Sequence, residues 1–412
     1  MLPLIIIGIG KLVYFISRIF NIGSGGTWPG EIALRVKPDI LKEFSSKLNK
    51  GCILVAGTNG KTTTSLMIKK ILESEGNKVI HNGSGANLLN GVVSSFIQYA
   101  SWNGQIDADW GVFEIDENSL PIVLNNLIYS SSEARSSRLL ASNNKKLIIV
   151  LLNLFRDQLD RYGEVDVIAE KWGKALTKLP KLFQKQMEHA TDSIFCLSCG
   201  GRLTYDGIYY SHLGVWKCER CGAKRPKPDI SKWESLLPGV YNKYNALAAV
   251  STAKTLGIPE KIIKKSLMNF SPAFGRQEEF IINEKKVKIF LSKNPAGFNE
   301  TLRTVISLGA KKLLFVLNDR IPDGRDVSWI WDVDFEEFLN NSMDIIVSGD
   351  RAYDMALRIK YANSSKFQIE EDLKKAIYLS IRKTPKSETL YILPTYSAML
   401  EVRKILKGRK IL

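Results

Sequence analysis

The sequence predicts an α/β protein in which a mostly parallel sheet is followed by a second, smaller α/β unit. Short apolar runs, such as 52–56 and 147–152, alternate with segments whose apolar residues recur at helical spacing. This alternation is typical of parallel strands joined by crossover helices, which cover both faces of the sheet. The pattern begins again after a linker with Pro and Gly at 271–277, so we expect two such units.

The expected elements divide the chain into segments. In the first unit we expect strands at 52–57, 78–82, 109–116 and 145–155, and helices at 31–50, 62–76 and 244–257. In the second we expect strands at 286–291, 312–318, 344–349 and 390–395. The resulting organisation is an N-terminal segment (1–46), a first domain (47–275) with an insertion (194–226), and a C-terminal domain (277–412).

Size, charge and cysteine content restrict the class of protein. A chain of 412 residues suits two or three domains. The net charge of +16 indicates an anionic partner, but scattered Lys and Arg do not choose among nucleic acid, nucleotide phosphates and an anionic membrane surface. Four of the five cysteines form two close pairs, and Cys52 is expected to be buried in a strand. This pattern excludes a disulfide scaffold and indicates the reducing cytoplasm.

The N-terminal segment is apolar and resembles a signal or anchor segment, so a true membrane anchor is one alternative. Lys11 and Arg18 interrupt the run at 1–20, and no charged region precedes it. A span needs about 20 uninterrupted apolar residues. We therefore expect a helix that packs on the protein or lies at a membrane surface, which allows peripheral contact with the inner face of the cell membrane.

A phosphate-binding loop follows the first predicted strand. It comprises Gly57, Thr58, Asn59, Gly60, Lys61, Thr62 and Thr63. The glycines allow backbone N–H groups to point at phosphate oxygens, and the following helix N-terminus adds partial positive charge. Lys61 is suited to bridge the β- and γ-phosphates of ATP, and the Thr62 hydroxyl to hold Mg²⁺. The position of the first glycine in the common eight-residue form holds Val55.

Further ligands for Mg²⁺ are expected at the exit of the strand at 109–116. The stretch "FEIDE" supplies Glu114, Asp116 and Glu117. Carboxylates are the hard oxygen ligands that Mg²⁺ requires, and an open α/β sheet binds ligands at the carboxyl ends of its strands.

The paired cysteines predict a zinc ribbon. Cys196 and Cys199 are separated from Cys218 and Cys221 by 18 residues, a spacing typical of a tetrahedral four-thiolate site. Four thiolates complete the coordination sphere, so the Zn²⁺ is expected to be structural. The alternative is a nucleic-acid surface formed by Tyr205, Tyr209, Tyr210, Trp216, Lys217 and Arg220.

These motifs resemble the Mur ligase superfamily of ATP-dependent cell-wall ligases. "AGTNGKTTT" resembles its nucleotide loop, and "FEIDE" is similar to its Mg²⁺ segment, which implies a Mg²⁺ role for Glu114. "GVYNKYNALAA" implies that Asn245 contacts adenine, and "FGR" brings Arg276 to the domain junction. In "NLFRDQLDRYG", Gln158 stands where many members carry a metal-binding His. "KNPAGFNE" implies that Lys293 meets nucleotide or substrate.

Within this superfamily the chain is most similar to the MurT family. The four-cysteine ribbon, "LSKNPAG" and "LNDRIPDGRDVSWIWDVDFE" carry this resemblance. It implies a heterodimer with a GatD-type glutaminase, and ATP-dependent amidation of the α-carboxyl of D-glutamate in the lipid II stem peptide to D-isoglutamine. It also implies that Asp326 completes the Cys–His pair of the glutaminase. The segment 175–196 is shorter than in the family, and the polar stretch 130–146 is longer.

The residues themselves indicate an external source of ammonia. Four cysteines are assigned to zinc, and only His81, His189 and His212 are present, so no Cys–His nucleophile pair is apparent. We expect no nucleic-acid partner. The alternatives are a Mur-type ligase that adds an amino acid and a nucleotide-regulated nucleic-acid-binding protein.

Overall fold

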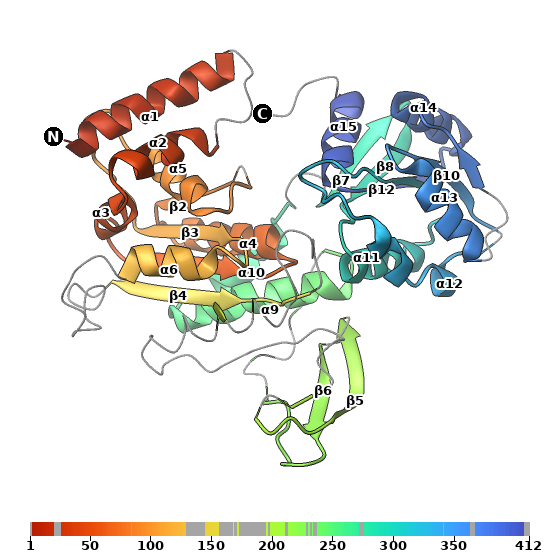
Figure 1. Ribbon diagram of the computed structural model, residues 1–412, viewed down its shortest axis with the longest axis horizontal. Helices are drawn as coiled ribbons and strands as arrows, with labels where there is room; N and C mark the ends of the chain where they lie inside the picture. The colour runs from red at the N-terminus through yellow and green to blue at the C-terminus, as the bar shows by residue number, and fades with distance from the viewer. Residues whose placement is uncertain are drawn as a thin grey trace.

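A computed structural model of the chain consists of two lobes, each built around a sheet, and a small two-stranded arm (Figure 1). The described residues are 2–19, 26–83, 85–128, 145–155, 168, 171–172, 195–196, 198–210, 213–227, 230, 233, 237–271, 276–340, 342–362 and 367–407.

The first lobe contains a four-stranded parallel sheet with the strand order β2-β3-β1-β4. Its strands are β1 (Gly51–Ala56), β2 (Val79–His81), β3 (Trp110–Ile115) and β4 (Lys146–Leu151). All residues of β1 and β3 are buried, as expected for central strands with helices on both faces.

Two hydrophobic cores lie on opposite faces of this sheet. Alternate residues of β1 enter different cores, with Cys52 and Leu54 on one face and Ile53 and Val55 on the other. The first core is covered by α1 (Leu2–Ile19), α2 (Trp28–Val36), α3 (Ile40–Ser46), α5 (Leu89–Tyr99) and α6 (Leu120–Ile128). The second is covered by α4 (Lys61–Ser74), α9 (Val240–Thr255) and α10 (Glu260–Met268).

The single helix expected at 31–50 is two helices, α2 and α3. The break contains Pro38, which lacks a backbone N–H and disfavours helical conformation at the residue before it. The expected N-terminal helix is α1, which packs on α2 and α5. Among the described residues, no helix is both long and apolar enough to cross a membrane.

The second lobe contains a six-stranded sheet with the order β11-β10-β9-β12-β8-β7. Its strands are β7 (Arg276–Ile282), β8 (Lys285–Phe290), β9 (Lys312–Val316), β10 (Asp344–Ser348), β11 (Phe367–Ile369) and β12 (Thr389–Pro394). Its helices are α11 (Pro295–Ser307), α12 (Phe335–Phe338), α13 (Ala352–Tyr361), α14 (Leu373–Lys383) and α15 (Tyr396–Lys407), with a short 3₁₀ helix at Ser328–Asp332.

The edge strand β7 was not among the expected strands, and it is antiparallel to β8. The turn between them places Asn283 and Glu284 at φ angles of 49° and 64°. A two-residue hairpin with positive φ at both positions usually carries Asn-Gly or Asp-Gly. This turn has Asn at the first position but Glu rather than Gly at the second, so it matches the preference at one position only.

The two-stranded arm consists of β5 (Leu203–Tyr210) and β6 (Leu213–Cys218), which are antiparallel. It lies between β4 and α9 in the sequence and projects from the first lobe (Figure 1). The predicted α/β class, with a parallel sheet, a four-cysteine insertion and a C-terminal α/β unit, is confirmed.

Candidate active site

The phosphate loop connects β1 to α4, as predicted, and needs glycine at two positions. Gly57 and Gly60 have φ angles of 145° and 88°, which other residues rarely adopt. A Cβ atom on Gly60 would lie 2.1 Å from Oδ1 of Asn245. One on Gly57 would lie 2.8 Å from the carbonyl oxygen of Asn153. Both contacts are too close, so each glycine allows a neighbouring chain segment to approach the loop.

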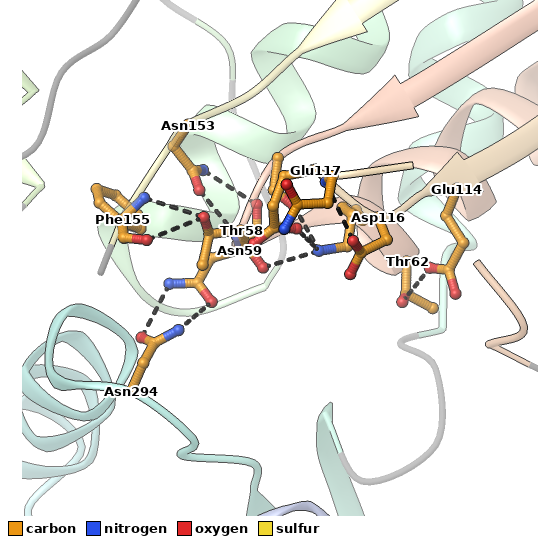
Figure 2. A network of polar contacts seen from close by, with 12 residues as sticks. Thr58, Asn59, Thr62, Glu114, Asp116, Glu117, Asn153, Phe155 and Asn294 are labelled. Carbon is orange, nitrogen blue, oxygen red and sulfur yellow. Dashed lines mark hydrogen bonds and ion pairs between the residues drawn. The ribbon is translucent and has the colours of Figure 1, made fainter. Parts of the chain in front are cut away.

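Residues after β4 hold the loop in place (Figure 2). The Asn153 side chain accepts a hydrogen bond from Asn59 N at 2.8 Å and donates one to Asn59 O at 3.0 Å. The Thr58 hydroxyl donates to Phe155 O at 3.2 Å and accepts from Phe155 N at 3.0 Å. The backbone of the loop is therefore fixed by the residues that follow β4 as well as by its own helix. Asn153 was not singled out from the sequence.

Lys61 is buried, and its ammonium group has three partners in the first lobe. It donates to the carbonyl oxygens of Gly57 and Thr58, and to Oε2 of Glu117 at 3.1 Å. Burial alone would raise the pKa of Glu117, but the positive charges of Lys61 and Lys293 hold that pKa below its ordinary value. The Glu117 carboxylate is therefore ionised at neutral pH and holds the Lys61 ammonium group beside the loop.

The Thr62 hydroxyl and the Glu114 carboxylate meet, as their predicted Mg²⁺ role requires. The hydroxyl donates to Oε2 of Glu114, which is buried at the end of β3 (Figure 2). Asn82 clamps the backbone of Glu114 by accepting from its N–H at 2.9 Å and donating to its carbonyl oxygen at 2.8 Å. A hydroxyl and a carboxylate held in contact fit the oxygen chemistry of Mg²⁺. Asp116 instead accepts from the backbone N–H of Asn118 at 3.1 Å, a local turn contact.

A cavity of about 330 Å³ lies between the two lobes at this loop. It brings together most of the predicted site residues, namely Thr58, Asn59, Gly60, Lys61, Thr62, Thr63, Glu114, Asn245, Arg276 and Lys293. The first lobe supplies the phosphate loop, Glu114 and Asn245. The second lobe supplies Arg276, at the start of β7, and Lys293, just before α11.

Tyr396 and Glu300 are among the lining residues of the cavity that the sequence did not reveal. Tyr396 lies at the start of α15, and burial raises the pKa of its phenol, whereas the nearby charge of Arg276 lowers it. Glu300, on α11, is 2% exposed, and burial raises the pKa of its carboxyl group. Its Oε2 atom has no hydrogen-bond partner in the described part of the chain, although its other carboxylate oxygen accepts from Arg303. Such an oxygen is suited to accept a hydrogen bond from a ligand.

Asp326 does not line this cavity. Its carboxylate is exposed and accepts hydrogen bonds from the backbone N–H and the hydroxyl of Ser328, at 2.8 and 2.9 Å. The loop that carries it begins at the cavity, which Pro322 lines, and is anchored by buried Asp323, which accepts from Ser397 N at 2.8 Å. Asp326 therefore faces solvent on the second lobe, apart from the nucleotide loop.

The four cysteines form one cluster in the arm. Their sulfur atoms all lie within 4.8 Å of one another. The Cys196–Cys221 and Cys199–Cys218 sulfur pairs are 3.7 and 3.5 Å apart. Zn–S bonds of about 2.3 Å in a tetrahedron place sulfurs roughly 3.8 Å apart, so the cluster fits Zn²⁺.

Each cysteine pair is followed by the same turn. Gly200 N donates to Cys196 O at 2.7 Å, and Gly222 N donates to Cys218 O at 3.1 Å. The φ angles of these glycines are 68° and 72°. Gln158, His189 and His212 lie outside the described residues.

The fold is similar to those of solved Mur-type ligases. A pseudomurein peptide ligase type C from Methanothermus fervidus matches with a TM-score of 0.63 and 22% identity, over 90% of this chain and 80% of that one. MurF from Acinetobacter baumannii matches with a TM-score of 0.57 and 15% identity, over 90% and 78%. The chain therefore has the fold of the Mur-type ligases, with a phosphate loop facing a cavity between two lobes.

Relatives with higher sequence identity to this chain identify the family to which it belongs. The MurT subunit of lipid II isoglutaminyl synthase (glutamine-hydrolyzing) from Staphylococcus aureus strain COL is 32% identical over 95% of each chain. The same subunit from Streptococcus pneumoniae is 31% identical over 98% of this chain and 96% of that one. The family model for the MurT ligase C-terminal region matches residues 291–399. The chain belongs to the MurT family.

Proposed function

We propose that this protein is the ATP-dependent ligase subunit of a lipid II isoglutaminyl synthase. It converts the α-carboxyl of D-glutamate in the lipid II stem peptide to the amide of D-isoglutamine, with ammonia from a GatD-type glutaminase. The observation that carries the proposal is the cavity that joins Lys61, Thr62 and Glu114 of the first lobe to Arg276 and Lys293 of the second. It is supported by the family to which the chain belongs.

The chemistry requires activation because a carboxylate has no adequate leaving group. Its oxygen attacks the γ-phosphorus of ATP, ADP leaves, and an acyl phosphate forms. Ammonia then attacks the acyl carbon, phosphate leaves, and the ammonium formed on nitrogen loses a proton to give the amide. The protein contributes positioning and charge neutralisation rather than a covalent intermediate.

The residues in the cavity have different roles in this reaction. Lys61 binds the β- and γ-phosphates, and Arg276 offsets charge on the transferred phosphoryl group. Thr62 and Glu114 would hold Mg²⁺, which would supply further positive charge at the phosphates. Asn245, beside Gly60, binds the adenine base. Lys293 approaches substrate or nucleotide from the second lobe, and closure of the lobes keeps water away from the acyl phosphate.

The ammonia source is proposed to be a separate subunit. Burial raises the pKa of Cys52 to about 12, so this thiol does not form the thiolate that glutamine hydrolysis needs. Burial also lowers the pKa of His81 to about 3, and its ring contacts the Ser65 hydroxyl rather than a cysteine. The four remaining cysteines form the proposed structural zinc site.

Asp326 is proposed to serve the partner subunit. An exposed carboxylate whose two oxygens are oriented by Ser328 is suited to accept a hydrogen bond from an incoming histidine and to favour its charged form. Apolar side chains support a docking face nearby. Trp331 packs edge-on against Tyr361 at 5.5 Å, and Tyr353 and Leu357 are exposed on the same helix, α13, at four-residue spacing.

The test uses purified protein with ATP, Mg²⁺, lipid II and ammonium, and mass spectrometry to detect conversion of the acid to the amide. We expect amide formation with ammonium alone, and with glutamine only when the glutaminase is added. Amino-acid addition in place of amidation would instead identify a ligase that joins an amino acid. We place the reaction in the cytoplasm, at the inner face of the membrane.

A further inference from the structure

The N-terminal helix α1 is apolar on both its buried and its exposed sides. Ile6 and Ile7 are buried in the first-lobe core. The opposite side exposes Ile5, Ile9, Leu12, Phe15, Ile16 and Ile19, which are between 42% and 61% exposed and are here termed the N-terminal apolar face. A helix that is apolar all round is normally surrounded by apolar material on all sides. Within the part of the chain that the structure describes, only one side of α1 is covered by protein.

The spacing of these residues makes the face continuous. The series 5, 9, 12, 16 and 19 advances by alternating steps of four and three, which places its members along one side of a helix. The loop before β3 extends the apolar surface, because Trp102 is 71% exposed and lies beside α1, with the Lys11 ammonium 5.4 Å from its ring centre. In Figure 1, α1 lies at the outer edge of the first lobe, outside α2 and α5.

The charges around this face favour an anionic occupant. α1 contains no Asp or Glu, and its two charged residues are Lys11 and Arg18. Residues 1–50 contain seven Lys and Arg but three Asp and Glu, and the whole chain carries +16. Basic residues beside an apolar helix face are typical of helices that bind anionic lipid surfaces, and Trp prefers the boundary between headgroups and acyl chains.

We propose that the N-terminal apolar face docks on an anionic lipid bilayer, with α1 lying in the plane of the interface rather than across it. The choice of a bilayer over a protein partner rests in part on the proposed function, since the relatives are named for lipid II. Docking would hold the cavity close to a substrate that remains anchored in the same membrane.

Vesicle flotation tests the proposal with the full chain. The vesicles are phosphatidylcholine with phosphatidylglycerol, and phosphatidylcholine alone serves as the comparison. The test variant is Leu12→Asn/Phe15→Asn. The matched control is Met268→Asn/Ile281→Asn, which changes two residues that are 68% and 60% exposed on other elements. Circular dichroism melts establish that each variant is folded.

We expect the wild type and the control to float with anionic vesicles, and the test variant to bind at least tenfold more weakly. Binding should also weaken with added salt and on phosphatidylcholine alone. Equal binding by the two variants, or no binding by the wild type, would overturn the proposal. So would concentration-dependent self-association that requires Leu12 and Phe15 and occurs without vesicles, because the face would then bind a second copy.

A separate assay distinguishes failure of this inference from failure of the proposed function. Amidation of a lipid-free stem-peptide substrate with ammonium does not require a bilayer, so the test variant should match the wild type there. Absence of amidation by every variant would contradict the proposed function but leave the flotation result intact.

Discussion

The side-chain amides of Asn59 and Asn294 donate hydrogen bonds to each other across the two lobes, at 3.1 and 3.0 Å (Figure 2). Asn59 is the residue whose backbone Asn153 clamps in the phosphate loop. Asn294 is buried and caps α11 by accepting from Gly297 N at 2.8 Å. The pair therefore links the nucleotide loop directly to the helix that carries Glu300.

The variant Asn294→Asp removes the hydrogen bond that Asn294 donates to Asn59 but retains the cap of α11. Aspartate retains the cap but cannot donate to Asn59, and it adds a negative charge near the phosphates. Loss of a buried hydrogen bond costs about 1–3 kcal/mol, so we expect the KM for ATP to rise roughly tenfold or more. Asn269→Asp, at an exposed position, is the control. Unchanged steady-state kinetics in Asn294→Asp would show that the pair plays no part in nucleotide binding.

Substitution of Lys61 should abolish both nitrogen routes. In Lys61→Ala the phosphates lose a preorganised positive charge, and we expect amidation to fall roughly 100- to 1000-fold with ammonium or glutamine. Lys69→Ala removes a more exposed lysine from the same helix, whose partner is Glu73, and should leave both rates near wild type. Amide formation is measured by mass spectrometry. Substantial activity in Lys61→Ala would exclude the assigned role.

The ion pair between Lys61 and Glu117 predicts an acid dependence of stability. The folded pKa of Glu117 lies below the ordinary value of 4.5, so this carboxylate adds stability above pH 4.5 that is lost as pH falls through the folded pKa. Thermal melts should show wild type more stable than Glu117→Gln near neutral pH, with the difference shrinking below pH 4.5. A difference that is constant across this range would contradict the assignment.

Asp326→Asn should affect the glutamine-dependent rate of amidation but not the ammonium-dependent rate. The residue lies outside the cavity, so we expect the ammonium-dependent rate to remain near wild type. The glutamine-dependent rate with the partner subunit should fall by orders of magnitude, because the incoming histidine loses its carboxylate. Asp332→Asn, an exposed position in the same segment, is the control. Equal loss on both routes would remove Asp326 from the partner's triad.

The zinc assignment predicts a metal-dependent arm. Elemental analysis should find one zinc ion per chain, and the ion should be lost in Cys199→Ser/Cys221→Ser but retained in Cys52→Ala. Because four thiolates would leave no open position for chemistry, the metal should stabilise the protein without entering the reaction. The wild type should therefore melt at a higher temperature than the double variant. Zinc retained by the double variant would contradict the four-cysteine site.

The phosphate loop and the cysteine cluster could be predicted because their residues are close in sequence and each has a local pattern with a chemical reason. Glu114 was predicted from its place at a strand exit and from resemblance, Asn245 from resemblance alone, and the fold brings both to the loop. Asn153, Glu300 and Tyr396 were missed because their roles come from tertiary approach. The local sequence around Asn153 does not indicate that its side-chain amide forms hydrogen bonds with a loop that is 94 residues away.

The elements of the second lobe could also be predicted only in part from the sequence. Its central strands were predicted from buried apolar runs, which parallel sheets require. The edge strand β7 carries Gln277, Glu278 and Glu279 among its residues and has no such run. The separation of Asp326 from the cavity also depends on how the loop at 319–327 crosses the lobe, which no local pattern specifies.

The central claim is that the cavity between the lobes activates a carboxylate as an acyl phosphate. The most direct test is to follow the transfer of a carboxylate oxygen to the released phosphate. Lipid II carrying a heavy oxygen isotope in the α-carboxyl of D-glutamate is incubated with the protein, ATP, Mg²⁺ and ammonium, and the released phosphate is analysed by mass spectrometry. The account predicts one labelled oxygen in the phosphate for each amide formed. Amide formation with unlabelled phosphate, or no ATP consumption with any nitrogen donor, would contradict it.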